Sequence, residues 1–136
     1  MNIIKKYNED ISLLLTEQTS NILFKDGIPD FSELFFEYDE HLKRENDCVI
    51  IGTYNKYDII IELPEQLLYI LFPDDKMFLN SSLLQFVNYI NIYKRLLNRE
   101  ILSNNAEQLL LMIDENAFND KDYFWGAWHE EIPRGF

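Results

Sequence analysis

Three apolar runs rich in β-branched and aromatic residues fill the middle of the chain. They are CVIIGTY at 48–54, DIIIEL at 58–63 and LLYILF at 67–72. Only a few residues separate one run from the next, whereas a parallel crossover needs about a dozen or more. The pattern therefore predicts neighbouring antiparallel strands in a meander, and KMFLN at 76–80 is a candidate for one more edge strand.

After Asn80 the spacing of apolar residues changes from the period of a strand to that of a helix. One helical face up to residue 97 carries Leu83, Phe86, Val87, Ile90, Tyr93 and Leu97. Asn and Ser side chains can accept hydrogen bonds from the first amides of a helix, and Ser82 and Gln85 have capping-box spacing. Asn80-Ser81-Ser82 is thus interpreted as a helix start with a structural role only.

The pattern before residue 48 is less regular. Residues 4–18 predict an amphipathic helix with the apolar stripe Ile4, Tyr7, Ile11, Leu14 and Leu15. NILF at 21–24 is a short strand candidate, and KDGIPD at 25–30 has the chemistry of a turn. FSELFFEYDEHL at 31–42 fits a strand or a short helix, and we expect extended structure followed by an irregular acidic loop.

Two helices are predicted near the C-terminal end. The first runs from about 104 to 118, with Asn104 and Glu107 at capping spacing and a stripe of Ala106, Leu109, Leu110, Ile113 and Ala117. The second is short and covers the aromatic segment YFWGAW at 123–128. Together the elements predict one α+β domain spanning 1–136: a central antiparallel meander sheet with an N-terminal helix and C-terminal helices packed on it.

Charge restricts the classes of partner. The formal net charge is −12, and only Lys43 and Arg44 oppose the acids of the segment 26–47. These acids are Asp26, Asp30, Glu33, Glu37, Asp39, Glu40, Glu45 and Asp47. Such a surface repels phosphate backbones and anionic membranes, so direct nucleic-acid or membrane binding is disfavoured, while a basic protein partner is attracted. An acidic surface that merely keeps the protein in solution is the alternative.

The chain shows no enzyme signature. It has two histidines, His41 and His129, and neither has a second His or Cys at metal-ligand spacing. The four glycines form no nucleotide-binding pattern. The single cysteine, Cys48, lies in an apolar run and is expected to be a small buried thiol. We therefore expect no catalytic residue, metal or cofactor.

The compartment is expected to be the cytoplasm. A single cysteine fits a reducing environment, residues 1–10 lack the apolar core of a signal peptide, and no window has the length of a membrane span. Nothing in the sequence indicates an oligomeric state.

The aromatic segment at 123–128 supports two interpretations. Tyr123, Phe124, Trp125 and Trp128 lie between acidic residues and could anchor a protein interface, as aromatic residues often do. Packing into the core is the alternative and is favoured for Trp125 and Trp128. Tyr123 is kept as a candidate contact residue.

The order of several motifs resembles the SUKH superfamily of immunity proteins, and within it the fourth SUKH group. The motifs are GIPD at 27–30, VIIGTY at 49–54, FLNSSLLQFVNYI at 78–90 and the late YFW and HEEI. The third is similar to the phenylalanine-x-asparagine-serine-serine-leucine helix start of that family. One departure is Pro64 in ELPEQLLYIL, where family members carry a glycine-containing turn.

The resemblance implies a bacterial antidote that binds a cognate toxin, a nuclease or deaminase, and blocks its active site. The toxin would be basic, and the expected contact residues are Asp26, Asp30, Glu33, Glu37, Asp39, Glu40 and Tyr123. A regulatory or scaffold protein of the same fold, binding another protein, is the alternative. An enzyme built from scattered carboxylates is the least favoured hypothesis.

Overall fold

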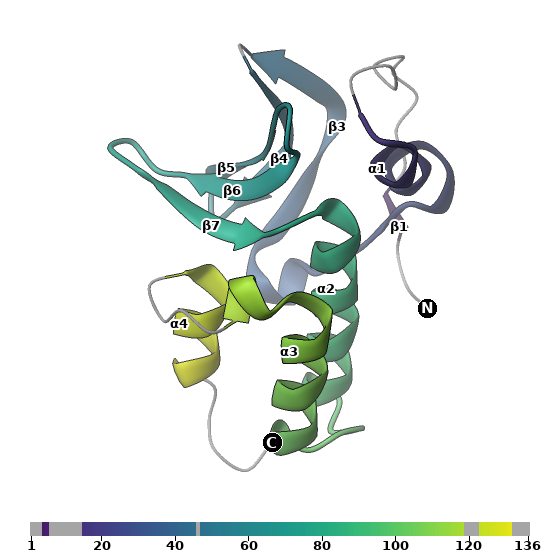
Figure 1. Ribbon diagram of the computed structural model, residues 1–136, viewed down its shortest axis with the longest axis vertical. Helices are drawn as coiled ribbons and strands as arrows, with labels where there is room; N and C mark the ends of the chain where they lie inside the picture. Colours follow the sequence, from purple (N-terminus) through teal and green to yellow (C-terminus); the bar gives the residue numbers. More distant parts are fainter. Residues whose placement is uncertain (1–3, 6–14, 46, 119–122, 132–136) are drawn as a thin grey trace.

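The structure is a computed structural model that describes residues 4–5, 15–45, 47–118 and 123–131. Its centre is a five-stranded sheet in the order β3-β4-β5-β6-β7, and each strand is antiparallel to its neighbours (Figure 1). The strands are β3 (Phe36–Glu45), β4 (Cys48–Tyr54), β5 (Tyr57–Glu62), β6 (Leu67–Leu71) and β7 (Lys76–Asn80). The predicted meander is confirmed, including KMFLN as its edge strand β7.

Three C-terminal helices follow the sheet. They are α2 (Leu83–Leu97), α3 (Ser103–Phe118) and α4 (Phe124–Glu131). In Figure 1, α2 and α3 run side by side below the end of β7, and α4 lies next to them. The predicted α+β class and all three helices are confirmed. Asn104 is not a cap, however, because α3 begins one residue earlier, at Ser103.

The N-terminal elements differ from the prediction. Ile4–Lys5 forms the short strand β1, which pairs with β2 (Ile28–Pro29), so a helix over 4–18 is wrong at its start. Helix α1 (Glu17–Asn21) begins only after Thr16, whose side-chain oxygen accepts a hydrogen bond from the Thr19 amide. Residues 6–14, the middle of the predicted helix, lie outside the described residues.

The strand predicted for NILF is also wrong. Residues Ile22–Asp26 form the π-helical turn η2, in which the Gly27 amide donates to the Ile22 carbonyl at 2.7 Å. Ile22 and Leu23 are buried. A short apolar run at a buried position has no periodicity that separates strand from helix, which explains the error.

Residues 31–42 contain both a short helical turn and part of a strand, the two structures that the sequence allowed for this segment. A 3-10 turn, η3 (Ser32–Leu34), comes first and ends at Phe35, which has a left-handed φ of 66°. Strand β3 then continues to Glu45, so the expected acidic loop is part of a strand. Between Tyr38 and Lys43 the register with β4 shifts, and this irregularity accompanies a bend that is visible in Figure 1.

The core lies between the helices and one face of the sheet, here called the inner face. Ile59 and Ile61 of β5 belong to the same buried cluster as α2, α3 and α4. Trp125 of α4 is fully buried, as predicted, and stacks on Tyr93 with 4.8 Å between ring centroids. The Trp128 side chain lies outside the described residues.

Gly52 allows β3 and β4 to approach each other closely. A Cβ at this position would lie 2.3 Å from the Glu37 carbonyl oxygen and 2.8 Å from the Tyr38 Cα. Both atoms belong to the backbone, which cannot move aside as the end of a side chain could. Glycine is therefore required at the centre of this strand pair.

The Asn80-Ser81-Ser82 segment does more than begin a helix. Ser82 is the N-cap of α2, and its Oγ accepts a hydrogen bond from the Gln85 amide at 3.2 Å, as the capping interpretation predicted. The buried carboxylate of Asp114, in α3, accepts bonds from Asn80 Nδ2 at 3.1 Å and from the amide and Oγ of Ser81, each at 2.8 Å. This segment thus connects β7 to α3.

Asp114 also marks a kink in α3. Its backbone is non-helical, with φ −156° and ψ 84°. The Tyr89 hydroxyl donates to the carbonyls of Leu110 and Asp114, and Trp125 Nε1 donates to Asn80 Oδ1 at 2.7 Å. One buried polar network therefore connects β7, α2, α3 and α4.

Candidate functional site

The first three predicted contact residues lie on the segment that leads into β3. Asp26 is exposed at the end of η2. Asp30 is half-buried, and its carboxylate accepts a 3.1 Å hydrogen bond from the Ser32 hydroxyl, so it has a local structural partner. The backbone of Glu33 belongs to η3, but its side chain lies outside the described residues.

The next three predicted residues lie on β3 itself. Glu37 is exposed and pairs in register with Thr53 of β4. Asp39 is half-buried and Glu40 is exposed, and both lie in the stretch where the register shifts. The acids of β3 therefore follow the strand at the edge of the sheet.

Tyr123 lies near the opposite edge of the sheet. It is half-buried, and its ring centroid is 5.0 Å from that of Phe78 in β7. Strands β3 and β7 are the two ends of the strand order, but the ring of the next residue along the chain, Phe124, lies 5.6 Å from that of Phe36, the first residue of β3. Tyr123 thus contacts β7, while the residue after it packs against the start of β3, next to Glu37.

The face of the sheet opposite the core, here called the outer face, has a regular composition. Ile60 lies between the inward residues Ile59 and Ile61 and therefore points outward. Strand register extends this assignment across the sheet in three rows. The central row is Lys43, Ile50, Ile60, Tyr69 and Phe78. The flanking rows are Glu37, Thr53, Asp58, Leu71 and Lys76, and Glu45, Cys48, Glu62 and Leu67.

Each flanking row carries two carboxylates. Glu37 and Asp58 belong to one row, and Glu45 and Glu62 belong to the other. The Lys76 ammonium forms an ion pair with the Glu62 carboxylate, with 2.6 Å between Nζ and Oε2. The same ammonium lies 4.3 Å from the centre of the Tyr69 ring. Because both partners are substantially exposed, this ion pair contributes little to stability.

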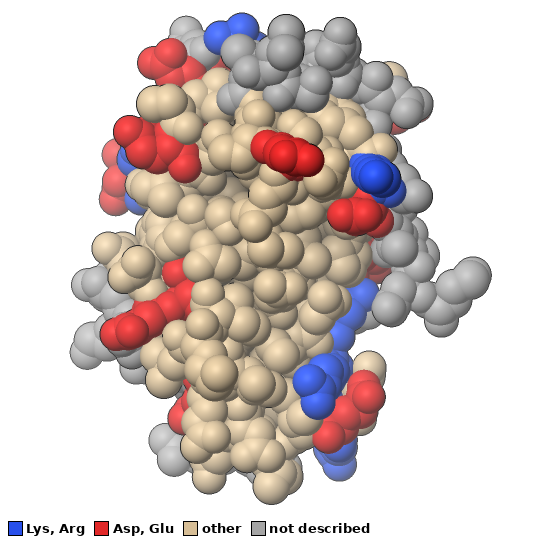
Figure 2. Space-filling model, turned by 45° about the vertical axis from the view of Figure 1, so that its right-hand side comes forward, with Lys and Arg blue, Asp and Glu red and all other residues tan. Residues whose placement is uncertain are grey.

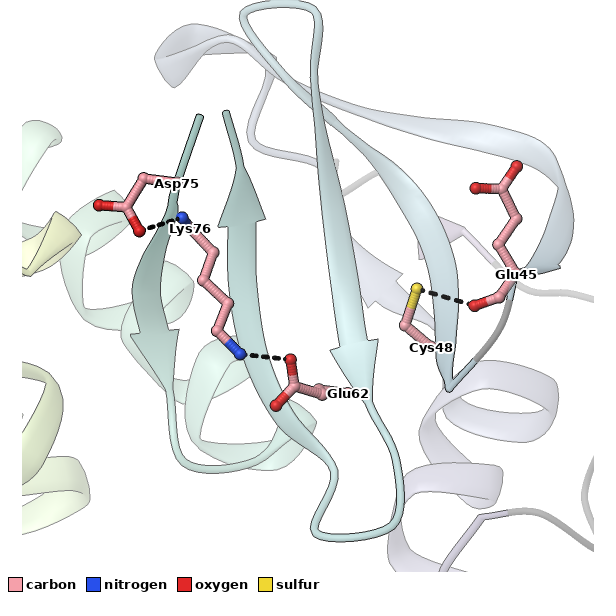
Figure 3. Close-up of polar contacts among 5 residues, drawn as sticks. All are labelled: Glu45, Cys48, Glu62, Asp75 and Lys76. Carbon is pink, nitrogen blue, oxygen red and sulfur yellow. Dashed lines mark hydrogen bonds and ion pairs between the residues drawn. The ribbon is translucent and has the colours of Figure 1, made fainter. Parts of the chain in front are cut away.

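Cys48 lies in an acidic part of the outer face, close to several carboxylates. It is half-buried on the outer face, so the expectation of a buried core thiol is wrong. Its Sγ donates a 3.3 Å hydrogen bond to the Glu45 carbonyl (Figure 3). Burial raises the pKa of the thiol, and the negative charges of Glu45, Glu62, Asp58 and Asp47 raise it further. The thiol is thus held in its unreactive, protonated form.

Sequence reasoning did not select Asp58 and Glu62 as candidate residues. They flank three consecutive isoleucines of β5, of which Ile60 points to the same face as the two acids. A continuous apolar run of this kind is typical of a strand buried on both faces, so the sequence gives no alternation that would mark the two acids as residues of one exposed face. Their position opposite Cys48, Leu67 and Leu71 depends on the register, which the sequence alone does not provide.

Negative charge is unevenly distributed over the molecule. Figure 2 shows a face on which charged side chains lie mainly around the margins of a broad uncharged centre. Residues 77–93, which include most of β7 and α2, contain no charged residue at all. The outer face of the sheet, in contrast, carries four carboxylates within two rows.

The described residues offer no arrangement typical of metal chemistry. Within 4–5, 15–45, 47–118 and 123–131, no three His, Cys, Asp or Glu side chains gather closely enough to hold a metal ion. Asp114 is buried but is occupied by hydrogen bonds to the backbone and side chains of the fold. In the same part of the chain, no helix combines the length and hydrophobicity that crossing a membrane requires.

Comparisons with models of protein families, with curated proteins and with solved structures find no match to this chain.

Proposed function

We propose that this chain is an immunity protein that binds a basic bacterial toxin domain and blocks its active site. In this function it is a stoichiometric inhibitor and carries out no reaction of its own. The toxin belongs to a class that acts on nucleic acids or nucleobases, a nuclease or a deaminase, because such proteins carry cationic grooves for phosphate backbones.

The observation that carries this proposal is the set of carboxylates on β3 and on the outer face of the sheet. Glu37 and Glu45 of β3 and Asp58 and Glu62 of β5 lie in two register rows, with Lys43 and Lys76 as the cations of the same face. An excess of negative charge on one face accelerates association with a cationic partner and suppresses binding of anionic ones. It suits an inhibitor that occupies a groove built for nucleic acid.

The sequence motifs support the same function. The helix start FLNSSL at 78–83 resembles that of the fourth SUKH group, and its Asn80 and Ser81 anchor α3 through Asp114. This explains why such a motif suits the fold. It says nothing about the partner, so the proposal rests on the charge of the surface and on the resemblance.

The test is binding to the protein encoded beside the gene of this chain. We expect a one-to-one complex, inhibition of the partner's activity, and an affinity that falls as salt is added, since exposed charges are screened. Absence of binding at low salt contradicts the proposal. A tight complex that leaves the partner's activity intact favours a regulatory or scaffold protein instead.

A further inference from the structure

Strand β6 is apolar on both of its faces. Leu68 and Ile70 point inward and are fully buried in the core. Leu67, Tyr69 and Leu71 alternate with them and therefore point outward. An antiparallel sheet with one face in water normally carries polar residues on that face, so polar and apolar residues alternate along its strands. A strand whose residues are apolar throughout is typical of a sheet that is buried on both faces.

The outward side chains of β6 are only partly covered within this chain. Leu71 is 41% exposed, and Leu67 and Tyr69 are half-buried. The buried cluster that joins the helices to the sheet contains Leu68 and Ile70 but none of these outward residues. Leu67, Tyr69 and Leu71 therefore form an apolar stripe on the outer face, here called the β6 stripe.

Carboxylates lie directly beside the β6 stripe. Asp58 is the register partner of Leu71, and Glu62 is the register partner of Leu67. Directly opposite residues of neighbouring strands have Cβ atoms about 5 Å apart. A partner group that covers Leu71 therefore has the Asp58 carboxylate within reach of its flanking side chains. Lys76 of β7, the register partner of Leu71 on its other side, pairs with Glu62 and lies over the Tyr69 ring.

We propose that the β6 stripe and the acids of β5 form the docking surface for the toxin of the proposed function, on which this inference rests. The occupant is a cationic protein surface with an apolar or aromatic side chain at its centre. That side chain covers Leu71, and Lys or Arg side chains beside it pair with Asp58. Glu62 and Tyr69 border this contact and are engaged by Lys76 of the same chain.

Charge complementarity selects this occupant over a second copy of the chain. The chain has a net charge of −12, and a symmetric dimer through this face would bring Asp58 and Glu62 of both copies together. Like charges facing each other in an interface are strongly unfavourable. A cationic partner removes that repulsion and also supplies the apolar contact that β6 lacks.

The experiment measures the affinity of the full chain for the protein encoded beside its gene, with variants inside and outside the surface. We expect Leu71→Glu and Asp58→Lys each to weaken binding about tenfold or more, because a central contact of an interface is lost or a charge is reversed. Met112→Glu is the matched control for the first, since Met112 is 82% exposed on α3. Glu100→Lys is the matched control for the second, since Glu100 is exposed in the connection between α2 and α3, and both controls should bind within about twofold of the unmodified chain.

The outcomes separate this inference from the function on which it rests. No binding by the unmodified chain contradicts both. Binding that Leu71→Glu and Asp58→Lys leave intact, but that Asp39→Lys weakens, contradicts the docking surface and supports the function. Sedimentation that shows a dimer of the unmodified chain, lost in Leu71→Glu, also overturns the inference, because the stripe would then bind a second copy. Thermal unfolding of each variant confirms that it is folded.

Discussion

Replacing Asp114 with alanine removes a buried carboxylate that accepts three hydrogen bonds from the junction between β7 and α2. The donors are Asn80 Nδ2, the Ser81 amide and the Ser81 hydroxyl. Asn80 is fully buried, so its unpaired amide group costs about 2 kcal/mol. Ser81 is half-buried and water can replace part of its loss, which adds about 1 kcal/mol.

The expected loss is therefore about 3 kcal/mol of unfolding free energy, and a decrease in Tm of about 10 °C. Urea unfolding followed by tryptophan fluorescence measures it, because Trp125 is buried and its Nε1 donates to Asn80. Met112→Ala, on the exposed side of α3, is the control and should change the free energy by less than about 0.5 kcal/mol. A loss below about 1 kcal/mol for Asp114→Ala would refute the view that this network holds α3 against the sheet.

Three further predictions concern other parts of the structure. Gly52→Ala should cost about 3 kcal/mol of unfolding free energy, because the new Cβ meets the backbone of β3, and urea unfolding measures it. Burial, and after it the charge of Asp114, raises the pKa of the Tyr89 hydroxyl, so the native state keeps a proton that the unfolded state releases. Stability should therefore fall as pH rises above about 10, and Tyr89→Phe should reduce this slope by about 1.4 kcal/mol per pH unit. Cys48 should react with iodoacetamide near pH 8 more slowly than a free cysteine, and Glu62→Gln should accelerate the reaction because it removes one of the charges that raise the thiol pKa.

Each of these has a result that contradicts it. Gly52→Ala with unchanged stability would mean that β3 and β4 separate without cost. An alkaline slope that is the same in Tyr89→Phe would place the titration on other groups. Alkylation of Cys48 at the rate of a free cysteine would show that neither burial nor the neighbouring carboxylates act on the thiol.

The sheet was predictable because the residues that indicate it lie close together in the sequence. The apolar runs of β4, β5 and β6 are each bounded by short breaks, and short breaks permit only antiparallel pairing. The start of α2 was predictable for the same reason, since Ser82 and the Gln85 amide are only three residues apart. The N-terminal elements were not, because short apolar runs such as NILF fit a strand and a buried helical turn equally well.

The role of Asn80 and Ser81 depended on a distant residue. Asp114 lies 34 residues after Asn80, and only the packing of α3 on the end of β7 brings its carboxylate to them. Read locally, both residues resemble helix caps. A buried polar partner far along the chain leaves no periodic signal in the sequence.

The negative charge of the candidate surface was predictable from the sequence, but its position on the outer face of the sheet was not. The acidic excess of residues 26–47 directed attention to β3, yet Asp58 and Glu62 of β5 share the outer face with Glu37 and Glu45. Their alignment depends on register shifts, between Tyr38 and Lys43 and between Ile50 and Gly52, which change the residues that face each other. No rule of composition or spacing gives such a shift.

The most direct test of the central claim is a titration of the protein encoded beside this gene with the purified chain, at low and at high salt. We predict that one equivalent abolishes the partner's activity at low salt, and that the affinity decreases steadily as salt increases. A partner that stays active in the presence of excess chain at low salt would contradict the claim that this acidic domain works by occupying a cationic site.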